Sequence, residues 1–144
     1  MKYILILFLI IFFSSCSNQY EQYYENYSGY DKANVRNKSW FPKQLIFNDT
    51  YALRNISCLD SLSAFGQFNY SKSFLYDSVF NNKEIQRLPI EKYLEKIQRN
   101  KINKPQWFHT PTSAERANLE IILIDRFYIA RDSVNKKISY VLSN

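Results

Sequence analysis

The spacing of apolar residues changes along the chain, and each change predicts a different element. Tyr51 to Cys58 is rich in β-type residues, and Ala64 to Tyr70 alternates between two faces, so we expect two antiparallel strands joined around Asp60-Ser61. From Ser71 to Asn82 apolar residues recur at helical spacing, and a serine can cap the first turn. The middle of the chain therefore predicts a hairpin followed by a helix.

The second half of the chain predicts another helix and a second strand pair. Pro89 fits a first helical turn and is followed by apolar residues at intervals of three and four. Leu119 to Ala130 is apolar on both faces and predicts one central strand, which Lys137 to Leu142 joins across a polar turn. The expected fold is α+β, a small antiparallel sheet in ββααββ order with one or two helices packed on one face.

The amino terminus has the layout of an export signal. Lys2 precedes an apolar run from Tyr3 to Phe13, which is shorter than the roughly 20 residues that a membrane-spanning helix needs. Ser14 and Ser15 then stand before Cys16, and two small residues before a cysteine resemble the lipobox of bacterial lipoproteins. We expect residues 1–15 to be a lipoprotein signal peptide and Cys16 to carry the lipid, such as palmitate. An ordinary secretory signal ending near a cysteine is the alternative.

Lipidation would place the protein in the cell envelope, because acyl chains on one cysteine hold a polypeptide firmly on a bilayer. Ser17 follows the cysteine where an aspartate would suggest retention at the inner membrane, so by analogy with lipoprotein sorting we expect the outer membrane. Residues 16–38 are rich in Tyr, Asn, Gln and Glu without an apolar face, which predicts a lipidated flexible tether. Residues 39–144 are expected to form a single globular domain.

Composition changes this picture little. The formal net charge is +6, but the basic residues are scattered, and Lys136-Lys137 is the only adjacent pair outside the leader. Scattered basic residues indicate a solvated surface, so no nucleic-acid partner is expected. Cys58 follows an apolar stretch and is expected to be a buried small hydrophobe.

Several aromatic motifs support a family resemblance. The chain contains Ser39-Trp40-Phe41-Pro42-x-x-Leu45, then Phe65-Gly66-x-Phe68-x-Tyr70, then Trp107-Phe108 and a Tyr-containing closing hairpin. This order, over roughly residues 39 to 142, resembles a family of small uncharacterised Gram-negative, Bacteroidetes-type lipoproteins, some of which are similar to a YbbD head domain. The resemblance implies an α+β fold and a lipidated, non-cytosolic location, and it supplies no catalytic residues.

The sequence offers little catalytic chemistry. His109 is the only histidine, so no typical zinc site can form and no metal or other cofactor is expected. Only two glycines are present, which rules out the usual phosphate loop and nucleophile elbow. Asp125 falls on an apolar face and is expected to form a structural salt bridge with Arg54, Arg116 or Arg131, or to lie at a strand end.

Two functional hypotheses follow. The first is a non-catalytic envelope lipoprotein that binds an envelope protein or glycan through aromatic side chains. The second is a small periplasmic hydrolase or polysaccharide-processing accessory enzyme that uses His109 with Glu115 or Asp125. The first is preferred, and its candidate interaction residues are Trp40, Trp107, Phe108 and Tyr128.

Overall fold

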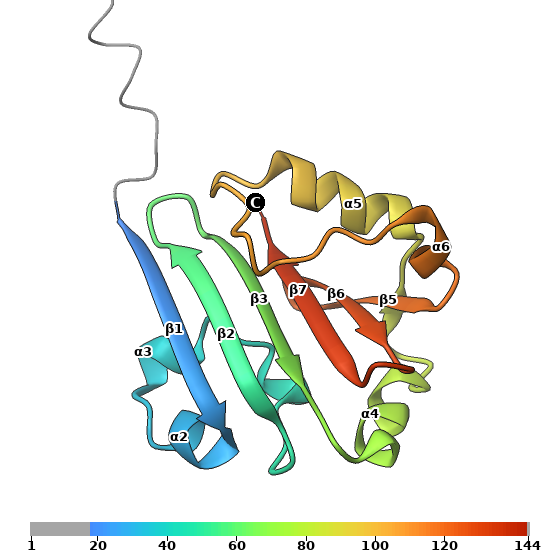
Figure 1. Cartoon of the computed structure of the whole chain (residues 1–144), viewed down its shortest axis with the longest axis horizontal. Helices are drawn as coiled ribbons and strands as arrows, with labels where there is room; N and C mark the ends of the chain where they lie inside the picture. The colour runs from blue at the N-terminus through green and yellow to red at the C-terminus, as the bar shows by residue number, and fades with distance from the viewer. Residues whose placement is uncertain (1–17, 144) are drawn as a thin grey trace, which may run out of the picture.

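The computed structural model of the protein describes residues 18–143, and Figure 1 shows the arrangement of their elements. One seven-stranded sheet runs through the molecule in the order β1-β2-β3-β7-β6-β5-β4, with every neighbouring pair antiparallel. The fold is therefore α+β, as expected. The strands are β1 (Gln19–Asn26), β2 (Tyr51–Cys58), β3 (Ser63–Asn69), β4 (Gln86–Arg87), β5 (Leu119–Ile124), β6 (Phe127–Asp132) and β7 (Lys137–Leu142).

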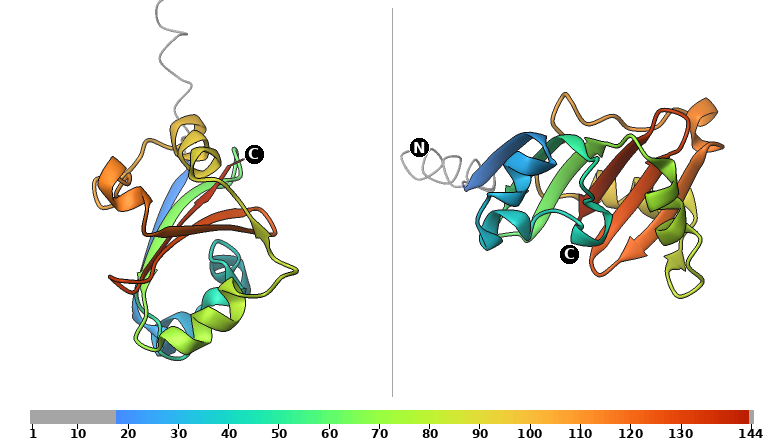
Figure 2. Two further views of the ribbon diagram at one scale, coloured as in Figure 1. Left: turned by 90° about the vertical axis from the view of Figure 1, so that its right-hand side faces the viewer. Right: turned by 90° about the horizontal axis from the view of Figure 1, so that it is seen from below.

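Helices cover both faces of the sheet, not one face as the sequence led us to expect. Figure 2 shows α5 on one side of the sheet and α4 with the N-terminal helices on the other. The reason is that the central strands carry apolar residues on both faces, so both faces need cover. The helices are α2 (Tyr27–Asp31), α3 (Val35–Lys38), the 3₁₀ turn η1 (Lys43–Leu45), α4 (Ser73–Phe80), α5 (Ile90–Arg99) and α6 (Ser113–Arg116).

Each face of the sheet carries its own hydrophobic core. The first core lies under α2, η1 and α4, and the second lies under α5 and the loop that follows it. Neighbouring residues of one strand enter different cores, because side chains alternate along a strand: Tyr140 is in the first core and Val141 in the second. The largest wholly buried side chains are Tyr70, Tyr76, Tyr93, Tyr140, Phe41, Phe65, Phe68, Phe80 and Phe108.

The prediction of one central strand from Leu119 to Ala130 is wrong, because this segment forms a hairpin of two strands, β5 and β6. Asp125 and Arg126 form a two-residue turn between β5 and β6, and Asp125 adopts a φ of 53°. Aspartate tolerates this left-handed conformation better than most residues. Ile124 and Phe127 are opposite partners across the turn, so both lie in the first core. A continuous strand would have placed them on opposite faces.

The flexible tether expected for residues 16–38 is also wrong over its described part, residues 18–38. β1 pairs with β2 from Gln19 opposite Cys58 to Asn26 opposite Tyr51. Tyr24 and Tyr30 pack edge-on or tilted against Phe41, with ring centroids 5.8 and 5.4 Å apart. The segment escaped detection because its inward positions are filled by tyrosine and glutamine, which do not form an apolar stripe.

The element order accordingly differs from ββααββ. β1, α2 and α3 precede the first expected hairpin, the short strand β4 follows α4, and the last expected pair is a three-stranded meander. The two expected helices and both β2–β3 and β6–β7 pairings are present. The expected signal peptide and Cys16 lie outside the described residues.

Candidate functional site

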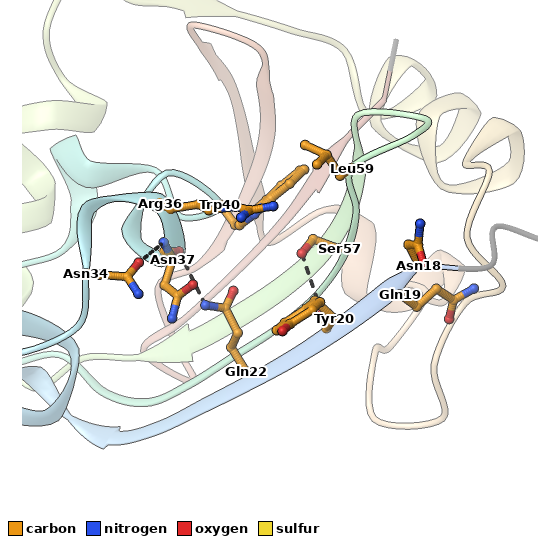
Figure 3. A pocket seen from close by; sticks show the side chains of 10 residues that line it. All are labelled: Asn18, Gln19, Tyr20, Gln22, Asn34, Arg36, Asn37, Trp40, Ser57 and Leu59. Atoms are coloured by element: carbon orange, nitrogen blue, oxygen red, sulfur yellow. Dashed lines mark hydrogen bonds between the residues drawn. The ribbon is translucent and has the colours of Figure 1, made fainter.

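A groove of about 510 Å³ opens on the first-core face of the sheet, between β1–β2 and the segment that contains α3 (Figure 3). β1 and β2 contribute side chains to one wall, on the same face of the sheet as the first core. The α3 segment forms the opposite wall. The lining residues are Asn18, Gln19, Tyr20, Gln22, Asn34, Arg36, Asn37, Trp40, Ser57 and Leu59.

Gln22 is a buried amide at the bottom of this groove, with only 8% of the residue exposed. Its Nε2 donates to Tyr24 Oη at 3.3 Å and approaches the Asn37 carbonyl at 3.5 Å. A carbonyl oxygen can only accept a hydrogen bond, so these contacts fix which end of the amide is nitrogen. Gln22 Oε1 has no hydrogen-bond partner among residues 18–143 and faces the groove (Figure 3).

Asn55 lies directly opposite Gln22 in the β1–β2 register. Its Nδ2 donates to the Trp40 carbonyl and to Tyr140 Oη, each at 3.1 Å, and its Oδ1 has no partner in the described part of the chain. A buried acceptor without a donor costs about 1–3 kcal/mol. Asn55 is wholly buried and is not among the lining residues, so of these two amide oxygens only that of Gln22 faces the groove, where a hydrogen-bond donor from outside the chain could reach it.

The α3 wall is held by local hydrogen bonds. Asn34 caps α3, its Oδ1 accepting from the Asn37 amide at 2.9 Å. Ser39 Oγ donates to the Arg36 carbonyl at 2.6 Å. Trp40 is half-buried and packs against the first core. These contacts hold the wall in place, and Arg36 is the only charged residue among the described residues that line the groove.

His109 and Glu115 come together, as the catalytic hypothesis requires, with Nε2 and Oε2 2.7 Å apart. The same Glu115 oxygen also accepts from the Thr112 amide at 2.7 Å and from Thr112 Oγ1 at 2.9 Å, forming the capping box of α6. The hydrogen bond from His109, followed by those from Thr112, lowers the pKa of Glu115 from 4.5 to about 2. The adjoining cavity measures only about 60 Å³.

These properties suit a helix cap better than a catalytic acid. Glu115 is ionised at neutral pH, so it has no proton to give, and its acceptor oxygen is already engaged. Both side chains are also open to water, about half of each being exposed. Asp125, the other carboxylate considered, lies elsewhere.

The salt bridge expected for Asp125 is wrong, whereas the strand-end position is right. Asp125 occupies the exposed β5–β6 turn and accepts from Gln44 Nε2 at 2.9 Å. Arg131 instead contacts Asp77 and Glu120. Of the other expected partners, Arg54 pairs with Glu21 at 3.1 Å, and Arg116 is exposed at the end of α6.

The four aromatic residues singled out in the sequence do not gather into one patch. Trp40 lines the groove. Trp107 lies on the second-core side, and its Nε1 donates to Glu21 at 3.1 Å. Tyr128 is half-buried below the ammonium of Lys96, 4.9 Å from the ring centroid.

Phe108 is wholly buried, its ring 4.7 Å from that of Phe65, so it serves the second core and is not presented to a partner. Sequence reasoning missed Gln22 and Asn55 altogether. The signal for Asn55 was present, because it alternates with Leu53 on an inward face of a predicted strand. The signal for Gln22 was absent, since its strand was taken for a tether.

Within residues 18–143, no helix combines the length and apolar character needed to cross a bilayer. In that same part of the chain, no three His, Cys, Asp or Glu side chains gather where they could hold a metal ion.

Comparison with known families gives one match. Residues 18–69 match the family model of the YbbD head domain, a segment that runs from β1 through β3 and contains every residue that lines the groove. Searches of curated proteins and of solved structures return no match. Over residues 18–69 this chain is therefore similar to the YbbD head domain, as the resemblance in its aromatic motifs predicted.

Proposed function

We propose that this protein is a non-catalytic lipoprotein of the cell envelope, in which the groove beside β1 and β2 binds a ligand or partner. The observation that carries the binding role is Gln22 Oε1, a buried acceptor that faces the groove and lacks a donor. A stable fold that leaves such a group unsatisfied gives up free energy, which a bound donor would restore. Strained or unsatisfied groups of this kind gather at binding sites.

The lipid anchor on Cys16 is supported by the sequence pattern of an apolar leader, two small residues and a cysteine. Anchoring there would hold the folded domain close to the bilayer, because β1 begins at Gln19. Three residues of extended chain span at most about 11 Å. The groove, whose lining begins at Asn18, would then open near the membrane surface, in the outer membrane by the sorting argument.

Labelling with a palmitate analogue tests the anchor. The full-length protein should incorporate the label and fractionate with outer membranes, and Cys16→Ala should lose both properties. Ser17→Ala is the matched control, because it changes the neighbouring residue and keeps the thiol. A labelled Cys16→Ala variant, or an unlabelled native protein with its leader still attached, would rule out this part of the proposal.

Retention on isolated envelope fractions tests the binding role. The detergent-extracted lipoprotein should be retained on an envelope fraction, and Gln22→Met, which removes the unsatisfied oxygen at similar side-chain volume, should weaken retention. Trp107→Ala is the control, since Trp107 lies on the opposite face of the sheet. Equal retention of all three proteins would show that the groove is not the binding site.

The distance of 2.7 Å between His109 and Glu115 gives an enzymatic function one supporting observation. In that alternative, hydrolysis of an envelope polysaccharide would depend on His109. Turnover of such a substrate that His109→Ala abolishes and Gln22→Met leaves intact would favour the alternative over the binding module.

A further inference from the structure

We infer that the groove is a saccharide site, an inference that rests on the binding role proposed above and names the class of ligand. The free Oε1 of Gln22 is an acceptor, so the ligand must bring a donor to this point. A phosphate or carboxylate brings only acceptors and would be repelled there, whereas a sugar hydroxyl donates.

Amide side chains dominate the lining around Gln22, and each amide both donates and accepts. Sugar hydroxyls have the same dual character, so they match amides more fully than a purely anionic or cationic ligand does. Within residues 18–143, Arg36 is the only charged side chain that lines the groove, which is too little positive charge for a phosphate-binding site.

Two aromatic residues line the groove. Trp40 stands on the α3 side, and Tyr20, 70% exposed, stands on β1 beside Gln22 (Figure 3). A pyranose has apolar C–H faces and polar edges, and aromatic rings offer an apolar surface to such a face. A lipid chain could use the rings but would leave Gln22 unsatisfied.

The groove volume of about 510 Å³ falls within the range of roughly 300–1,000 Å³ found for small-molecule sites. The groove is open to solvent, so a short segment of a longer chain could enter it. The occupant that meets all four requirements is an uncharged or weakly charged oligosaccharide of the envelope.

A glycan array tests this inference. Full-length protein, extracted in a polyoxyethylene detergent that carries no sugar headgroup, is applied to defined uncharged, N-acetylated and uronic acid-containing oligosaccharides. We expect binding to an uncharged or N-acetylated chain, followed by calorimetric titration with that chain. Gln22→Met and Trp40→Ala should each weaken the affinity at least about tenfold, and Trp107→Ala should leave it unchanged.

A second readout keeps every groove residue intact. The chain has two tryptophans, so Trp107→Phe leaves Trp40 as the only one. Saturable change in its emission on adding the selected oligosaccharide would report occupation of the groove. An unchanged emission at saturating sugar would overturn the assignment even if a groove variant failed to fold.

The outcomes separate the ligand class from the binding role. Retention on an envelope protein fraction with no sugar bound on the array would overturn the saccharide class and leave the binding module standing. Binding confined to uronic acid chains and insensitive to Gln22→Met would also overturn it. Absence of both sugar binding and envelope retention would overturn the two proposals together.

Discussion

The ring of Tyr140 lies directly over Gly66, its partner in the β3–β7 register, where an added Cβ would stand 2.0 Å from the ring Cζ. With no side chain in the way, the tyrosine crosses β3, and its hydroxyl accepts from Asn55 Nδ2 on β2 at 3.1 Å. The same Asn55 amide nitrogen also donates a hydrogen bond to the Trp40 carbonyl. The Gly66–Tyr140 contact therefore connects the centre of the sheet to the wall of the groove.

Gly66→Ala should lower the free energy of unfolding by about 3 kcal/mol, because the new methyl group must displace a buried ring and the backbone beside it. Urea denaturation followed by circular dichroism measures the loss. Gly29→Ala is the matched control, since its Cβ would meet no atom closer than 3.9 Å. The control should be neutral or stabilising by up to about 1 kcal/mol, as expected in a helix. Equal effects of the two substitutions would contradict the close contact.

Tyr93→Phe should raise the free energy of unfolding by about 1 kcal/mol, because the wholly buried Tyr93 hydroxyl has no partner among the residues that the structure describes and its desolvation is uncompensated. Burial also raises the pKa of this phenol. Tyr140→Phe, the matched variant, should lower the stability by a similar amount, since it removes a hydrogen bond to Asn55. A destabilising Tyr93→Phe in thermal denaturation would mean that a bound water satisfies the hydroxyl.

Arg131→Met should destabilise the fold by about 3 kcal/mol, because the guanidinium is nearly buried and serves several partners. It donates to Tyr70 Oη at 2.9 Å and pairs with Asp77 and Glu120. Arg131→Lys should recover only part of the loss, since one ammonium cannot reproduce this fork of contacts. The exposed Arg126 provides the control: Arg126→Met should change the urea midpoint very little.

The α6 cap should weaken in acid. The pKa of Glu115 is lower in the folded protein, about 2, than its ordinary value of 4.5, so ionisation of this carboxyl favours folding. Its contribution is fully present above about pH 4.5 and is lost as the pH falls toward 2. Titration of the Glu115 carboxyl carbon by NMR should give the low value directly. His109→Ala should raise it, because His109 provides the largest of the lowering hydrogen bonds.

Glu115→Gln supplies the corresponding stability test. Its unfolding free energy should lose the part of the acid dependence that falls between pH 4.5 and pH 2. Glu84→Gln, at an exposed position outside any cap, is the control and should retain that part. A Glu115 carboxyl that titrates near 4.5 would show that the capping box does not form in solution.

A chain shortened to begin at Ser39 should not fold cooperatively. It lacks β1, α2 and α3, so β2 loses its outer partner and Phe41 loses Tyr24 and Tyr30. Each large side chain that leaves the core costs about 1.5–3 kcal/mol, and a small domain has only about 5–15 kcal/mol in total. A chain that begins at Asn18 should fold. Heteronuclear NMR spectra distinguish the two outcomes, and a dispersed spectrum from the shorter chain would restore the tether interpretation.

Local patterns in the sequence were enough for several elements. Alternation identified the β2–β3 hairpin, and three-to-four spacing identified α4 and α5, because these segments place apolar residues on the face that their own geometry buries. The class of fold followed from the order of those elements. Trp40 was singled out from its type alone, and it is the only one of the four aromatic candidates that lines the groove.

Other features depended on partners distant in the chain. β1 was not predicted because an edge strand needs few apolar residues once β2 supplies its hydrogen bonds. The turn at Asp125 was not predicted because the segments before and after it, β5 and β6, are equally apolar, and no glycine marks the chain reversal.

The sequence by itself determined the α+β class, the positions of the strongly periodic elements and the scarcity of catalytic groups, since these follow from residue type and local spacing. Only the tertiary structure decided that Gln22 on β1 lies opposite Asn55 on β2 and that the Asn37 carbonyl orients the Gln22 amide. It also decided that the Glu115 carboxylate accepts the hydrogen bonds that cap α6. The physical reason is that a hydrogen-bonding group is satisfied or left unsatisfied by atoms that are near in space. No pattern along the chain specifies which atoms those are.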